Sequence, residues 1–374
     1  MAVSMQPLKG VRVLDFSTLL PGPLATLVLA EAGAEVIKIE RPGRGDEMRS
    51  YRPKFGDDSV NFALLNRGKR SIAMDLKAPD AMAKLTPLLQ SADVVVEQFR
   101  PGVMDRLGLG YDDLRRISPR IVYCAITGYG QAGPRADVAA HDLNYVAEAG
   151  MLALTCGADG APVVPSALVA DIAGGTYPAV INILLALRER DRTGLGCKLD
   201  VAMADNLFTM LYWGIGNGLA AGAWPKPGAE LVTGGSPRYN VYRTKDDRFL
   251  AAAPLEQKFW ETFCERLDVP AALRDDSVDG AATKQAIASR VRARTAAELQ
   301  QLFSGHDVCC TIAVTLQDAL RDEHFVSRGL FARSLSAAGK SIPALPVPVA
   351  EPFRSGERDA GYPALGEAND LLAP

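Results

Sequence analysis

Short apolar runs alternate with segments of helical spacing along the first half of the chain. The apolar runs are rich in Val and Ile, as buried strands are, and comprise Val11–Phe16, Glu35–Ile39, Ser71–Leu76, Asp93–Phe99 and Ile121–Thr127. Between several of them, apolar residues recur at a helical period, for example in Pro23–Ala32 and Pro79–Ser91. Strands that alternate with helices predict a parallel sheet covered on both faces. The pattern therefore predicts an α/β fold that is Rossmann-like in the loose sense.

The same patterning continues as far as residue 213. A long amphipathic run, Ile172–Arg190, predicts a helix that ends at the glycines of Thr193–Gly196. Lys198–Met203 then predicts a further strand. The segment from Gly214 to Pro237 is rich in Gly and Pro, which indicates a linker.

The pattern of apolar and polar residues changes after this segment. Two short apolar runs, Val241–Thr244 and Arg248–Ala253, flank a polar turn and predict a β-hairpin. Helical patterns follow in Gln257–Leu267, Lys284–Arg294 and Ala296–Phe303. We therefore expect a large α/β domain over 1–213, a linker over 214–237, a small α+β domain over 238–325, and a C-terminal segment, 326–374, that returns to the large domain.

Composition narrows the function classes. The 374 residues include 41 Lys and Arg against 44 Asp and Glu, so the net charge of −3 argues against binding to nucleic acid through its phosphates. The uncharged segments Phe16–Ala30 and Asn206–Pro225 are interrupted by Pro, or by Gly and Asn, so neither is expected to enter a membrane. None of the six cysteines forms a C-x-x-C pair. This pattern predicts reduced thiols, a cytoplasmic protein and no metal site.

One glycine-rich spacing suggests a nucleotide-binding loop, but the helix that should follow such a loop is missing from the pattern. Gly128–Gly133 satisfies G-x-G-x-x-G after a predicted strand, yet Pro134 follows and no helical pattern continues. A plain glycine-rich loop is therefore favoured over a nicotinamide site. The chain also contains neither a P-loop pattern nor a G-x-S-x-G motif.

Three residues are candidates for proton transfer. His141 follows the glycine-rich loop where a helix begins, and imidazole titrates near neutral pH; an incidental place beside a helix cap is the alternative. Asp171 starts a predicted helix, which is also an ordinary N-cap position. However, Gly174 and Gly175 in its first turn favour close approach of a ligand to the backbone. Glu256 starts another helix and by itself is an ordinary first-turn glutamate.

Basic residues gather near the ends of the predicted strands of the large domain. In open α/β sheets, ligands bind beyond the carboxyl ends of the strands. A local excess of Arg and Lys in an acidic protein favours a small ligand that carries phosphates, although solvated strand ends are the alternative. The candidates are Arg41, Arg67, Lys69, Arg70, Arg100 and Arg106.

Stretches spread over nearly the whole chain match a known family: Pro7–Asp15, Gly33–Lys38, Phe99–Gly102, Gly128–Gly130, Thr193–Gly196 and Asp200–Met203. On these residues the sequence resembles the family III CoA-transferase (CaiB/BaiF) superfamily, most closely its α-methylacyl-CoA racemase branch. The resemblance implies an interlocked homodimer in which the large domain binds CoA and the active site lies between one chain's large domain and the other's small domain. The basic clusters then correspond to the surroundings of the CoA phosphates and adenine. CoA is part of the substrate, so no separate cofactor is implied.

The resemblance also assigns roles. In the racemases the aspartate matching Asp171 is an acid/base that works opposite a histidine in an H-D-x-N-Y segment, which His141–Tyr145 fits at every fixed position. Glu256 resembles the glutamate beside that histidine. Several transferases carry a long glycine-rich flap near the start of the small domain, where this chain has only Gly234 and Gly235.

These features imply a racemase or epimerase that inverts the α-carbon of a 2-methylacyl-CoA through an enolate. We expect burial to raise the pKa of Asp171 from about 3.9 toward neutrality, and the N–H groups of Asp171 and its first turn to donate to the enolate oxygen. The alternatives are a CoA-transferase that uses Asp171 covalently and a non-catalytic acyl-CoA-binding protein.

Overall fold

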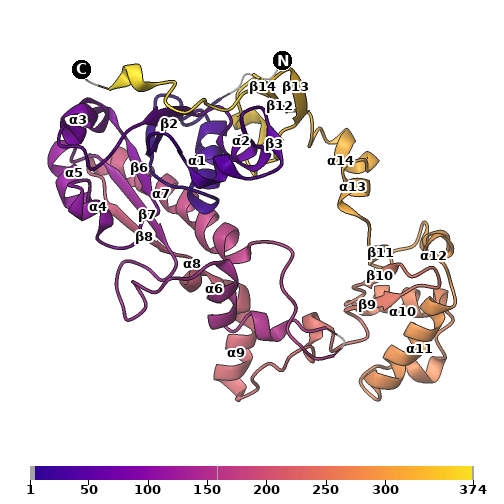
Figure 1. The fold of residues 1–374 in the computed structure, drawn as a ribbon. Coiled ribbons are helices and arrows are strands. Elements are labelled where there is room, and N and C mark those ends of the chain that lie inside the picture. Colours follow the sequence, from indigo (N-terminus) through magenta and orange to yellow (C-terminus); the bar gives the residue numbers. More distant parts are fainter. Residues whose placement is uncertain (1–4, 158, 373–374) are drawn as a thin grey trace. The chain divides into compact units, whose positions relative to one another are not determined.

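The computed structural model describes residues 5–157 and 159–372, which form two compact units (Figure 1). The large unit comprises the residues up to Ala149, Pro165–Met210 and the residues from Glu323 onward. The small unit comprises Gly150–Val164 and Leu211–Asp322. Each unit has its own hydrophobic core and is described by itself.

A six-stranded parallel sheet forms the centre of the large unit. Its strand order is β5-β2-β1-β6-β7-β8, and every neighbouring pair is parallel. The strands are β1 (Arg12–Asp15), β2 (Glu35–Glu40), β5 (Arg70–Ala73), β6 (Val94–Glu97), β7 (Val122–Thr127) and β8 (Lys198–Ala202). The predicted α/β fold is confirmed. The order reverses between β1 and β6, and the carboxyl ends of strands at such a switch point are where open α/β sheets bind ligands.

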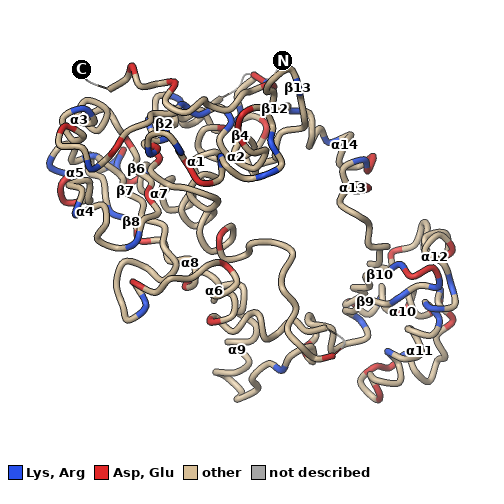
Figure 2. The backbone as a smooth tube through the Cα atoms, in the orientation of Figure 1, with Lys and Arg blue, Asp and Glu red and all other residues tan. Residues whose placement is uncertain are grey.

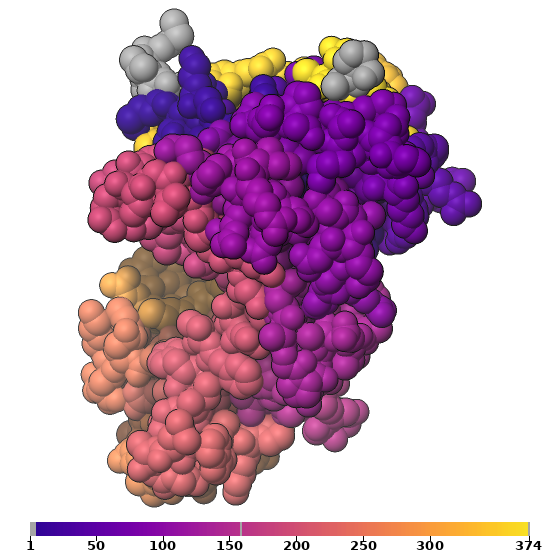
Figure 3. All heavy atoms as spheres, turned by 90° about the vertical axis from the view of Figure 1, so that its left-hand side faces the viewer, coloured from indigo at the N-terminus to yellow at the C-terminus, as the bar shows by residue number. Residues whose placement is uncertain are grey.

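Helices cover both faces of this sheet. The cluster of α3 (Ala81–Ser91), α4 (Val103–Arg106) and α5 (Tyr111–Ile117) buries Leu85, Leu89 and Leu114 against side chains of the strands. Atoms of this part of the chain, purple in Figure 3, form a continuous surface over one side of the unit. The helices α1 (Pro21–Glu31) and α7 (Tyr177–Thr193) contact β1, β7 and β8 as well as each other. The sheet is therefore buried between two helical layers, which explains why its strands are apolar without alternation.

The long predicted helix begins with a π-helical turn. Ala170–Thr176 is a π-helix that continues directly into α7, and together they form a helical stretch, Ala170–Thr193. This stretch is long and apolar enough to span a membrane by length and composition, but half of its most apolar 18-residue window is buried within the protein. Burial of this kind is typical of a core helix.

The small unit has an antiparallel sheet and a helical layer. The sheet order is β11-β10-β9, with β9 (Asn240–Arg243) and β10 (Phe249–Ala252) forming the predicted hairpin beside β11 (Cys310–Ile312). The helices α10 (Gln257–Arg266), α11 (Gly280–Arg292) and α12 (Ala296–Phe303) complete a core around Trp260 and Phe263.

The expected linker is partly helical, which corrects one prediction. Its first residues belong to α9 (Tyr212–Ala221). On this helix, Pro225 and Trp224 of the returning chain pack closely where Gly214 and Gly218 have no side chain. These glycines therefore serve close packing and do not mark a flexible segment.

The C-terminal segment packs against the large unit. It forms a small sheet of β12 (Ser334–Ala337), β13 (Lys340–Pro343) and β14 (Asp359–Ala360). Tyr362 then stacks edge-on against Phe62 of α2 (Val60–Asn66) and donates a 2.7 Å hydrogen bond to the carbonyl of Phe55.

Candidate active site

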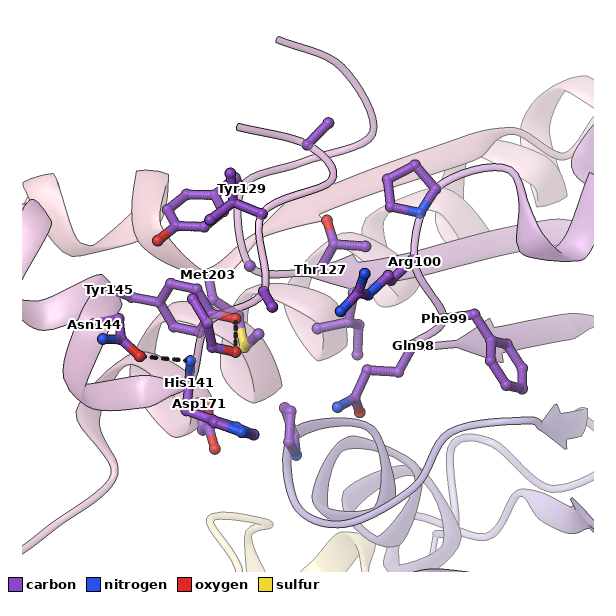
Figure 4. A pocket seen from close by; sticks show the side chains of 18 of the residues that line it. Gln98, Phe99, Arg100, Thr127, Tyr129, His141, Asn144, Tyr145, Asp171 and Met203 are labelled. Carbon is purple, nitrogen blue, oxygen red and sulfur yellow. Dashed lines mark hydrogen bonds between the residues drawn. The ribbon is translucent and has the colours of Figure 1, made fainter. Parts of the chain in front are cut away.

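A cavity of about 420 Å³ lies beyond the carboxyl ends of β6 and β7, next to the switch point of the sheet (Figure 4). Gln98, Phe99 and Arg100 reach it directly after β6, and Thr127, Gly128 and Tyr129 at the end of β7. Two of the predicted proton-transfer residues, His141 and Asp171, also line it, with Asn144, Tyr145 and Met203. The structure therefore brings together residues that lie 30 positions apart in the sequence.

The segment His141–Tyr145 is held by its own polar side chains. His141 immediately precedes α6 (Asp142–Glu148), and its backbone N–H donates to Oδ1 of Asn144 at 3.0 Å. The hydroxyl of Tyr145 donates to the carbonyl of Ala140 at 2.8 Å. Both bonds hold the peptide group between Ala140 and His141, on the N-terminal side of the imidazole. Asn144 acts back across one helical turn on His141, and Tyr145 acts across five positions on Ala140, so the spacing of the motif brings both side chains to the backbone that carries the imidazole.

Asp171 lies inside the π-helix and is not its N-cap, which corrects the predicted position. The cap position belongs to Val169, and the backbone N–H of Asp171 donates at 3.0 Å to Oδ1 of Asp142. That N–H group is consequently occupied and does not serve an enolate oxygen as expected. π-Helical turns are rare and occur often at functional sites.

Gly174 and Gly175 let this π-helix lie against the start of α8 (Met203–Asn206). A Cβ atom at Gly174 would overlap the backbone carbonyl oxygen of Met203, whereas one at Gly175 would lie 3.0 Å from the Met203 Cγ. Asn206 fastens the same contact by donating to the carbonyl of Gly174 at 2.8 Å. The glycines therefore allow close packing of two backbone segments beside the cavity. The sequence predicts that a ligand approaches the backbone here, whereas in the structure Met203 takes that place.

The environment of Asp171 raises its pKa to about 6. Burial is the main cause, because it disfavours the charged carboxylate, and the nearby Asp142 adds repulsion. His141 acts in the opposite direction. The expected rise is confirmed, and a carboxyl group that titrates near pH 6 can both take up and return a proton at neutral pH.

The six predicted basic ligands fall into distinct environments. Arg100 is exposed and lines the cavity with the proton-transfer residues. Arg41 is also exposed and lines a second cavity of about 480 Å³ beyond β1, β2 and β5, together with Lys77. Arg106 is exposed at the end of α4, and Arg70 forms an ion pair with Glu35 at the start of β2.

Arg67 and Lys69, two of the predicted CoA-binding residues, are buried. Arg67 pairs with Glu31 at 2.8 Å and donates to the carbonyls of Leu64 and Leu345. The Lys69 ammonium lies within hydrogen-bond distance of oxygens of Asp15, Pro23, Thr26 and Asn66. Both side chains therefore tie segments of the fold together. Arg67 also lines a cavity of about 250 Å³ with Glu31 and Arg333, which is separate from the cavity of His141 and Asp171. Sequence position alone could not separate these buried cations from the exposed Arg41 and Arg100.

Glu256 belongs to the small unit. It is exposed at the N-cap of α10, and its carbonyl accepts the N–H groups of Phe259 and Trp260.

Three residues of the site were not singled out from the sequence. Gln98 and Thr127 line the cavity, and the Thr127 hydroxyl is buried with no hydrogen-bond partner among the described residues. Asp142 holds the backbone of Asp171. Only Asp142 had a sequence signal, its fixed place in the His141–Tyr145 motif.

Comparison with known proteins identifies the family. The model of CoA-transferase family III matches residues 8–369. Alpha-methylacyl-CoA racemase of Homo sapiens is 35% identical over 335 residues, which cover 87% of this chain and 83% of that protein. Succinyl-CoA:glutarate CoA-transferase of Mus musculus is 38% identical over 277 residues, 73% of this chain and 62% of that protein.

A solved structure agrees along the whole length. The crystal structure of Rv3272 from M. tuberculosis is similar with a TM-score of 0.84 and 30% identity, covering 98% of this chain and 99% of that one. The relatives include both a racemase and a transferase at comparable identity, so similarity alone leaves the reaction open. The family match over nearly every residue, the parallel sheet and the similar structure lead to one conclusion: the chain belongs to CoA-transferase family III.

Proposed function

We propose that this protein is a racemase or epimerase that inverts the α-carbon of a 2-methylacyl-CoA thioester. The observation that carries the proposal is the pairing of His141 with Asp171 in one cavity, where the pKa of Asp171 is raised to about 6. Inversion by proton transfer needs two groups that can hold and release a proton, one for each face of the planar intermediate. An imidazole and a carboxyl group are both suited to this chemistry.

In the proposed reaction, one group removes the α-proton and the other returns a proton to the opposite face. Breaking the C–H bond leaves its electron pair on the enolate, and the carbon–proton bond re-forms from the other side. The enolate oxygen needs hydrogen-bond donors. Since the N–H of Asp171 is occupied, we propose that this donor comes from another group that lines the cavity.

The CoA part of the substrate is proposed to extend from this cavity along the strand ends. Arg100 in the first cavity and Arg41 in the second are exposed cations suited to phosphate groups. Phe99 lines both cavities, so they are neighbours on the large unit.

The proposed assembly is an interlocked homodimer in which Glu256 of one chain lies beside His141 of the other. Its support is the apolar surface of two helices, on which Ile181 and Leu185 of α7 and Tyr212 and Leu219 of α9 are exposed. Figure 2 shows both helices uncharged along most of their length. Exposed apolar patches of this kind mark interfaces, and the mass of the protein in solution tests the dimer.

Exchange of the α-proton with solvent deuterium tests the proposed reaction. A single-enantiomer 2-methylacyl-CoA in D₂O should gain deuterium at the α-carbon and lose optical activity, and both changes should disappear in His141→Ala and Asp171→Asn. If the substrate returns unlabelled with its configuration intact, the protein is not a racemase.

The second candidate is a CoA-transferase, favoured by the similarity to succinyl-CoA:glutarate CoA-transferase. Here the Asp171 carboxylate attacks the thioester carbonyl and forms a mixed anhydride as the CoA thiolate leaves. The thiolate then attacks the Asp171 carbonyl, which releases the carboxylic acid and leaves an enzyme–CoA thioester. Treatment with hydroxylamine during turnover would convert Asp171 to a hydroxamate, detected by mass spectrometry. His141→Ala should then have little effect.

A further inference from the structure

The carboxylate of Asp142 connects the two segments that carry the proposed proton-transfer groups. Asp142 is the residue after His141, and its Oδ1 accepts the backbone N–H of Asp171, 29 positions later, at 3.0 Å. It is 5% exposed and is not among the residues that line the cavity. Asp142 therefore touches the site through the backbone of Asp171 and does not contact a substrate directly.

A buried carboxylate in this place needs an explanation. Within residues 5–157 and 159–372, no Lys or Arg forms an ion pair with Asp142, although burial of an unpaired charge is costly. Its position in the first turn of α6 compensates part of that cost, because helix N-termini favour negative charge. Asparagine would supply the same hydrogen-bond acceptor without any charge. The hydrogen bond alone does not account for an aspartate here.

We propose that Asp142 is a positioning residue that acts through Asp171. Its carboxylate fastens the π-helical turn to the start of α6, and its negative charge keeps the Asp171 carboxyl group ready to hold a proton at neutral pH. This inference rests on the proposed racemase function, since it concerns the proton-transfer role of Asp171.

The other groups around Asp171 leave Asp142 as the one that opposes its ionisation. His141 favours the charged form of Asp171, and the phenol of Tyr145 is a further titratable group that interacts with it among residues 5–157 and 159–372. Among the neighbouring helices, α1 places Pro21 and α8 places Met203 against the π-helix, and the charged residue of α8, Asp205, lines a different cavity together with Tyr129. Burial supplies the larger part of the rise in the pKa of Asp171, and Asp142 supplies the charge-dependent part.

The test compares Asp142→Asn, which keeps the acceptor and removes the charge, with Asp142→Ala, which removes both. Asp137→Asn is the matched control, because Asp137 is exposed in the loop before His141 and is absent from the cavity lining. Two readouts are measured in each full-length enzyme. One is the carboxyl titration of Asp171 by ¹³C NMR with labelled aspartate, assigned with Asp171→Asn. The other is the pH profile of deuterium exchange with each enantiomer.

The expected result is a fall in the titration midpoint of Asp171 by about one pH unit in Asp142→Asn, and no change in Asp137→Asn. For the enantiomer whose proton Asp171 removes, exchange at pH 5 should rise from about a tenth of its plateau to about half, a fivefold relative gain. The plateau itself should fall, because a weaker base transfers protons more slowly. Asp142→Ala should lose at least about tenfold more activity than Asp142→Asn, because it also loses the hydrogen bond that holds the π-helix against α6.

An unchanged titration midpoint of Asp171 in a folded Asp142→Asn enzyme would overturn the inference. A lower plateau of the exchange rate would overturn it too, if the acidic side of the pH profile does not shift. The NMR titration does not depend on turnover. If the wild-type enzyme exchanges no deuterium but the midpoint still moves, the proposed function fails while the coupling between the two carboxyl groups stands.

Discussion

The packing of the π-helix on Met203 makes Gly174→Ala a sharp test of how the site is positioned. The new Cβ atom would overlap the carbonyl oxygen of Met203 and lie 3.2 Å from its carbonyl carbon. Backbone atoms cannot rotate away, so the π-helix must move by about 1 Å to restore normal contact distances. Overpacking of this kind costs about 3 kcal/mol, and the higher helix propensity of Ala returns about 1 kcal/mol. We expect a net loss of about 2 kcal/mol.

The activity should fall further than the stability suggests. Asp171 lies three residues before Gly174 in the same π-helix, so it moves with the backbone. A displacement of about 1 Å between proton-transfer groups can reduce the rate about 100-fold. Deuterium exchange measures this loss, and thermal unfolding followed by circular dichroism should show a decrease in Tm of about 6 °C. Tryptophan fluorescence is unsuitable, because all three tryptophans, at positions 213, 224 and 260, lie in the small unit.

The neighbouring glycine supplies the control. At Gly175 the new Cβ atom would meet the flexible side chain of Met203 at 3.0 Å, which can turn aside, and the Cβ of Pro21 at 3.2 Å, which requires a shift of only a few tenths of an ångström. Gly175→Ala should therefore change Tm by less than about 2 °C and retain most of the exchange activity. Equal effects of the two substitutions would refute the packing argument, and so would a Gly174→Ala enzyme with wild-type exchange.

Two further predictions concern buried charge. The folded protein holds the Asp171 proton more tightly than the unfolded chain does, so ionisation of Asp171 costs stability as the pH rises from about 4 to about 7. The free energy of unfolding of Asp171→Asn should accordingly exceed that of wild type by about 1 kcal/mol at pH 8, after allowance for partial exposure. The difference should vanish at pH 4, and thermal unfolding at both pH values measures it. Lys69→Met should cost about 3 kcal/mol or more in urea unfolding, because it leaves Asp15 buried without its cation. By contrast, Arg100→Ala should leave the unfolding midpoint unchanged and raise the KM for acyl-CoA; the opposite pattern would place Lys69 at the ligand.

The sequence by itself determined the α/β class and most of the elements. Buried parallel strands are continuous apolar runs, so Val94–Glu97 and Val122–Thr127 were visible in the pattern of Val and Ile. The helix Ala296–Phe303 has the bounds that the helical pattern predicts, and a capping box of Thr295 and Glu298 stabilises its start. The His141–Tyr145 segment could likewise be chosen as a candidate, because the motif that it matches is a run of five consecutive residues.

The tertiary structure decided what depends on contacts between distant residues. The meeting of His141 and Asp171 in one cavity, the occupied N–H of Asp171 and the burial of Lys69 each depend on atoms from elements that are far apart in the sequence. A local pattern cannot specify such contacts, because burial and charge pairing are set by what the rest of the fold brings alongside. For the same reason the glycine-rich start of α9 resembles a linker in the sequence, whereas in the structure Trp224 packs against Gly218. The sequence thus determined which groups could transfer a proton, and the packing of the π-helix determined the proton affinity of Asp171.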